Sequence, residues 1–148
     1  KSPSILNTPS ATMNLFLTPL KTLKLLTNQM IDYFQNLSKG IQNFISILLV
    51  LSIAVLHFMN PPDIETFDSL IGIDKLVHFL MFFFLTSWFV MIYKYSHKFI
   101  LLSYLVFFGL LLELMQMGFF IHRSFEWFDW IADSIGVIVG FFTISKWI

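Results

Sequence analysis

Charged residues are scarce in this chain of 148 residues, and cysteine is absent. Asp, Glu, Lys and Arg make up 12% of the sequence, whereas an average soluble domain carries about 25%. The absence of cysteine excludes disulfides and thiolate metal ligands, but it leaves open sites that are built from His and carboxylates. Positive and negative charges balance to a formal net charge of +0. Without a basic field to attract phosphates, we expect no nucleic-acid partner.

Apolar residues are abundant instead, since 57% of the chain is hydrophobic and 19 residues are Phe. A small soluble domain has too little interior to hide so many large apolar side chains. Four stretches have the roughly 20 residues that a helix needs to cross a hydrocarbon core of about 30 Å. They are residues 41–59, 76–93, 99–117 and 128–148. We therefore predict an all-α fold: a bundle of four transmembrane helices preceded by an N-terminal amphipathic helix.

The first forty residues differ from the rest. Residues 1–12 are rich in Ser, Thr and Pro, and we expect them to form a flexible N-terminal segment. In residues 13–40 apolar side chains recur every three or four positions, which predicts an amphipathic helix. Thr18 and Pro19 suit its cap and its first helical residue. This helix is expected to lie at the bilayer interface or to pack along the cytoplasmic end of residues 41–148, the membrane domain.

The distribution of Lys and Arg predicts the orientation. With four spans, seven of the nine Lys and Arg residues fall on the side that carries both termini. Because cytoplasmic loops are enriched in these residues, we expect cytoplasmic N- and C-termini. Lys75 and Arg123 are the two on the other side, where most of the acidic residues also lie.

Polar residues interrupt the apolar spans near their outer ends. In the second and fourth spans two such residues lie four apart, and in the third span two lie three apart, so each pair shares one helix face. Successive spans alternate in direction, which brings all three pairs to a similar depth. The polar cluster expected there consists of Asp74, Lys75, His78, Glu113, Gln116, Arg123, Asp129 and Asp133.

Glu113 is the sharpest indication of this cluster, because it stands within a run of leucines. An ionised carboxylate facing lipid is costly, so Glu113 is expected to face the protein interior and to meet Lys75, Arg123, His78 or a proton. The alternative is that such buried polar groups only hold helices together. His57 stands alone near the end of the first span, and we interpret it as an interfacial or hydrogen-bonded core histidine.

Small residues recur every four positions on the last span, at Ala132, Gly136 and Gly140. A stripe of this kind allows two helices to approach closely. We therefore expect it to pack against another span of the same chain.

Four motifs follow one another along the chain. They are DKLVHF at residues 74–79, ELMQ at 113–116, RSFEWFD at 123–129 and ADSIGVIVG at 132–140. In order and spacing they resemble the VanZ-like family of small integral membrane proteins, over roughly residues 44–148. Asp133 departs from the family pattern, which usually has Asn there, and it adds a carboxylate. The resemblance implies an envelope protein of the bacterial plasma membrane. The family's namesake is associated with low-level teicoplanin resistance, so an effect on glycopeptide susceptibility is implied as well.

The first candidate function is binding of a polar headgroup at the outer leaflet. Lys75 and Arg123 would pair with its phosphate, for which the planar fork of arginine is well suited. Membrane lipids, a polyprenyl-linked molecule or a peptidoglycan precursor are the expected partners.

Two other functions compete with it. A membrane-embedded hydrolase or transferase acting on an envelope lipid would use His78, Glu113, Asp129 and Asp133 as ligands of a divalent metal. No H-E-x-x-H motif is present, so the sequence by itself assigns no cofactor. A proton-coupled transporter would use the same intramembrane Glu and His residues.

Overall fold

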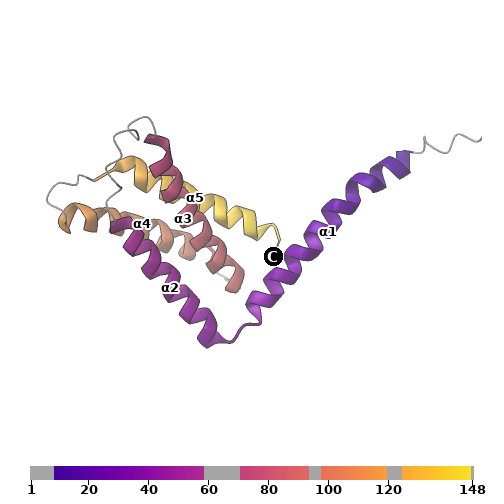
Figure 1. Cartoon of the computed structure of the whole chain (residues 1–148), viewed down its shortest axis with the longest axis horizontal. Coiled ribbons are helices and arrows are strands. Elements are labelled where there is room, and N and C mark those ends of the chain that lie inside the picture. Colours follow the sequence, from indigo (N-terminus) through magenta and orange to yellow (C-terminus); the bar gives the residue numbers. More distant parts are fainter. Residues whose placement is uncertain (1–8, 59–70, 94–97, 120–124, 148) are drawn as a thin grey trace, which may run out of the picture.

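The computed structural model describes residues 9–58, 71–93, 98–119 and 125–147, which form five helices and no strand. The helices are α1 (Pro9–Gln35), α2 (Lys39–Phe58), α3 (Ile71–Ile92), α4 (Lys98–Phe119) and α5 (Trp127–Ser145). Helices α2 to α5 lie together as a bundle, whereas α1 projects away from it (Figure 1). The predicted all-α fold is confirmed.

Four of the helices, α2 to α5, are long and apolar enough to cross a membrane, as predicted. Their boundaries differ most at α3, which begins at Ile71, five residues before the predicted start at residue 76. The extra turn carries Asp74 near the helix N-terminus, where the helix dipole favours a negative charge. The last span ends at Ser145 and not at residue 148.

The bundle exposes apolar side chains and buries polar ones. Phe44, Phe84 and Phe107 are 67%, 61% and 60% exposed, whereas Glu113 is 1% and Asp133 0% exposed. In water, this exposure of apolar side chains would be unfavourable. In a bilayer it is favourable, because the hydrocarbon core solvates apolar groups and excludes charged ones. Together with the four apolar helices, this pattern supports a multi-pass membrane protein.

Helices α3 and α5 make the most extensive contact in the bundle. The stripe on α5 meets the backbone of α3 directly. A Cβ added at Gly140 would lie 2.6 Å from the carbonyl oxygen of Phe83, and one at Gly136 would overlap the carbonyl oxygen of Phe79. Ala132, one turn earlier, is buried. Only residues this small let the two helices come so close.

This contact leads to a stability prediction. Gly136→Ala is expected to destabilise the bundle by roughly 1–3 kcal/mol, the usual cost of overpacking. Gly118→Ala is the matched control, because a Cβ there meets no described atom within 4 Å; it should be neutral or slightly stabilising. Thermal unfolding in detergent, followed by circular dichroism, measures both variants. Equal melting temperatures for the two would contradict the tight α3–α5 contact.

The N-terminal helix begins earlier in the structure than the sequence predicts. Helix α1 begins at Pro9 and continues through Thr18 and Pro19, which lie inside it. Proline fits the first helical position because its missing N–H has no partner there in any case, and Pro9 satisfies this role earlier in the chain. Residues 9–12 are thus helical, although they were predicted to be flexible, and residues 1–8 lie outside the described part of the chain.

The last turns of α1 pack on the bundle at the end where α2 begins. The ring of Phe34 contacts that of Trp88 edge-on, and Gln35 Nε2 donates to the carbonyl oxygen of Met91 at 2.9 Å. Gln42 Nε2 donates to the carbonyl oxygens of Phe34 and Gln35, which end the helix and lack partners within it. The C-terminal end of α1 is therefore part of the fold, and an interfacial location for the remainder stays a prediction.

Candidate functional site

Polar side chains gather at one end of the bundle, where α2 and α4 end and α3 and α5 begin. They form two sets. The inner group is His57, His78, Glu113 and Asp133. The rim group is Asp74, Lys75, Glu126 and Asp129. Because of the alternating chain direction, each of the four membrane helices contributes at least one of these residues.

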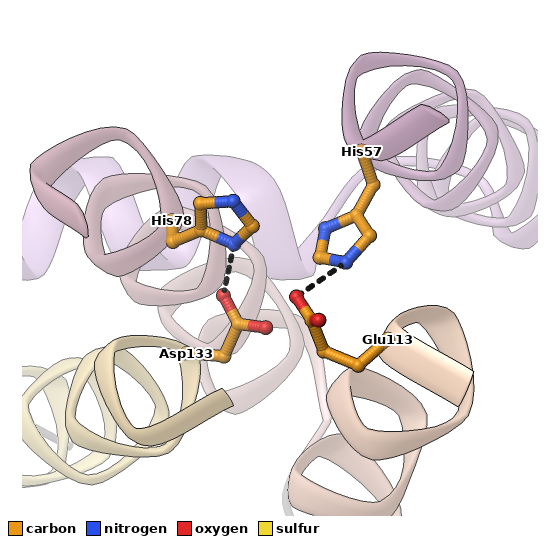
Figure 2. A group of neighbouring side chains, drawn as sticks. All are labelled: His57, His78, Glu113 and Asp133. Carbon is orange, nitrogen blue, oxygen red and sulfur yellow. Dashed lines mark hydrogen bonds and ion pairs between the residues drawn. The ribbon is translucent and has the colours of Figure 1, made fainter. Parts of the chain in front are cut away.

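The inner group consists of two close pairs that face one another (Figure 2). His57 Nε2 lies 3.1 Å from Glu113 Oε1, and His78 Nδ1 lies 3.1 Å from Asp133 Oδ1. The centroids of the two imidazole rings are 4.7 Å apart. All four residues are buried, with at most 4% of their surface exposed. Four helices thus direct one side chain each toward a common centre.

No lysine or arginine in the described part of the chain balances the charges of the inner group. Among the described residues, neither Glu113 nor Asp133 contacts such a side chain. Within the same part of the chain, Asp133 Oδ2 and His57 Nδ1 have no hydrogen-bond partner. Buried carboxylates and unpaired polar atoms are costly unless a cation or a donor satisfies them. Within the described part of the chain, the inner group therefore calls for positive charge, either as protons on its own side chains or as a bound cation.

The geometry of the inner group fits a metal ion. One ligand atom from each residue lies within 4.8 Å of the other three. Bonds of about 2.0–2.1 Å in a tetrahedral zinc site place ligand atoms about 3.3 Å apart. The two pairs at 3.1 Å already have that spacing, so a metal site would require only that one pair approaches the other. Two imidazoles and two carboxylates suit zinc and related divalent ions.

The rim group is organised around Lys75. Its Nζ lies 3.1 Å from Asp74 Oδ2 and 3.0 Å from Glu126 Oε2, and it also forms an ion pair with Asp129. The sequence led us to expect Lys75 to pair with the phosphate of a ligand, but in the structure three carboxylates surround it. His78 joins the two groups, because its Nε2 lies 3.9 Å from a carboxylate oxygen of both Asp74 and Asp129.

The other predicted site residues differ in their contacts. Gln116 Nε2 donates to the backbone carbonyl of His57, which ties the end of α4 to the end of α2. Glu113 Oε2 accepts a hydrogen bond from the backbone N–H of Glu126 at 3.4 Å, at the start of α5. These contacts position the inner group. Arg123 lies outside the described residues.

His57 is the inner-group residue that sequence reasoning missed. It was interpreted as an isolated histidine, yet it lies against Glu113 and His78 and is 2% exposed. One signal could have found it. The first span runs in the direction that brings its end, and hence His57, to the level of the predicted cluster.

Comparisons with known proteins show a family but no individual relative. No curated protein and no solved structure matches the chain. The sequence does match the VanZ/LLP1 family, over residues 2–148. This match covers almost the whole length, including all five helices and both groups of polar residues. The chain is therefore a member of the VanZ-like family.

Proposed function

We propose that this protein binds one divalent metal ion through the inner group and acts on the polar headgroup of an envelope lipid, as a membrane-embedded hydrolase or transferase. The observation that carries the proposal is the convergence of His57, His78, Glu113 and Asp133, all buried, from four different helices. Sequence reasoning placed pure headgroup binding first. The three carboxylates around Lys75 weaken the case for pure headgroup binding, because a lysine that is already paired with carboxylates is poorly suited to bind a phosphate.

The competing interpretation is an ionic network in which both histidines are protonated and only hold the helices together. A divalent ion accounts for more of the geometry. It balances the charges of Glu113 and Asp133 and uses the ligand spacing described above. It also explains why a membrane protein retains costly polar groups at one level, since intramembrane ionisable residues usually serve a function.

The position of the site favours a substrate that has its polar part at the membrane surface. The side chains of Asp74 and Glu126 are 43% and 44% exposed, so the rim group connects the buried inner group with the outside of the bundle. On the Lys and Arg distribution, this end faces away from the cytoplasm. A phospholipid or a polyprenyl-linked envelope precursor would present its headgroup at this level.

The chemistry divides among the residues of the two groups. A bound divalent ion would supply Lewis acidity toward a phosphoryl or carbonyl oxygen. Catalytic zinc sites use three protein ligands and leave one position open. His57, His78 and Glu113 would be these ligands, and Asp133, whose Oδ2 has no hydrogen-bond partner among the described residues, would accept a proton from the attacking group. Gln116 and the backbone N–H of Glu126 hold His57 and Glu113 in place.

Metal analysis of the purified protein tests the proposal. We expect about one equivalent of zinc or another divalent metal per chain after purification in mild detergent. Chelation should remove it, and titration with zinc should restore it. The same samples are extracted for lipid, and a headgroup-bearing lipid should co-purify with the metal-loaded protein and decrease after chelation. A folded, monodisperse protein that holds less than a tenth of an equivalent, and that shows no saturable zinc binding, would overturn the proposal in favour of the ionic network.

A further inference from the structure

Two residues of the rim group form a second set of ligand atoms together with His78. One atom each from Asp74, His78 and Asp129 lies within 4.8 Å of the other two. Asp129 is 1% exposed, and its Oδ2 has no hydrogen-bond partner among the described residues. His78 takes part in both sets through different nitrogens: Nδ1 is near Asp133 in the inner group, and Nε2 faces Asp74 and Asp129.

A cation already lies beside this second set, and it belongs to the chain. The ammonium group of Lys75 contacts carboxylate oxygens of Asp74, Glu126 and Asp129. Lys75 supplies one positive charge to these three carboxylates, so an excess of negative charge remains at the rim. Such an arrangement resembles a cation site in which a lysine stands in place of a metal ion.

We propose that the Lys75 ammonium fills a second cation position, formed by Asp74, His78 and Asp129, and thereby limits the protein to one divalent ion. The statement that the wild-type protein holds one divalent ion in the inner group rests on the proposed function. Removal of the Lys75 charge is then expected to open the second position to a divalent metal.

Zinc stoichiometry of Lys75 variants tests this inference. With zinc alone as the probe, equilibrium dialysis in detergent followed by elemental analysis should give one more equivalent for Lys75→Met than for the wild type. Lys75→Arg keeps the charge and should bind no additional zinc. The double variant Lys75→Met/Asp129→Asn should lose the extra equivalent, because it removes a buried carboxylate of the second position.

Loss of Lys75 could itself impair folding, so a stability measurement accompanies the stoichiometry. Zinc should raise the melting temperature of Lys75→Met more than that of the double variant, since only the former retains the second position. Equal stoichiometry and equal zinc-induced shifts in Lys75→Met and the wild type would overturn the inference, as would two equivalents in the wild type. If the wild type binds no zinc while Lys75→Met binds one equivalent, the proposed function fails and this inference stands.

Discussion

His57→Ala is expected to abolish tight metal binding. The substitution removes one of the two imidazole ligands and leaves Glu113 without its imidazole partner at 3.1 Å. The loss of zinc affinity should exceed the roughly 10–100-fold that follows when a residue that only orients a ligand is removed. Competition between the protein and a chromophoric zinc chelator measures the affinity directly.

Gln42→Ala provides the matched control for this experiment. Gln42 lies on the same helix, is 1% exposed and is hydrogen-bonded. It precedes His57 by 15 residues, which corresponds to about 22 Å along the helix. Its loss should lower stability and leave zinc affinity unchanged. Should His57→Ala bind zinc as tightly as the wild type does, His57 is not a ligand, and its place in the inner group is only structural.

Glu113→Lys is expected to prevent stable folding, whereas Glu113→Gln should be tolerated. Glu113 is 1% exposed and faces His57, so lysine would bury a longer cation beside an imidazole. An uncompensated buried charge costs roughly 3–5 kcal/mol, which is a large share of the stability of a small domain. Glutamine nearly preserves the shape and removes the charge.

The yield of monodisperse protein and the melting temperature in detergent compare these two variants. Glu113→Gln should retain most of the wild-type yield but bind zinc more weakly, because an amide oxygen is a poorer ligand for zinc than a carboxylate. Similar folding of Glu113→Lys and Glu113→Gln would show that the side chain at this position reaches solvent and would contradict the burial of the inner group.

The membrane architecture could be read from the sequence because its causes are local. A run of about 20 apolar residues forms a membrane span whatever its neighbours are, so all four spans were predicted within a few residues, apart from the start of α3. The alternation of direction then brought Asp74, Glu113 and Asp129 to one end of the bundle. That reasoning needs only the number of spans.

The partners within the site could not be predicted, since they depend on how each helix is rotated and packed. The sequence provides no means to decide that Lys75 contacts Glu126, which lies 51 residues later, or that His57 meets Glu113 on α4. Helix rotation is decided by packing, here above all by the contact of Gly136 with α3. The start of α1 was missed for a different reason: Pro9 and Pro19 both fit a first helical turn, and the chain uses the earlier one.

Because α3 and α5 pack closely, the pair of His78 and Asp133 is held more rigidly than the pair of His57 and Glu113. His78 and Asp133 lie on α3 and α5, whose backbones are in direct contact. Helix α2, which carries His57, makes far fewer contacts with the rest of the bundle. Segments with few contacts open more readily than tightly packed ones. If the protein binds an ion or a headgroup as proposed, a small displacement of α2 would admit it while α3 and α5 hold His78 and Asp133 in place. Uptake and release would then leave the tightly packed α3–α5 pair undisturbed.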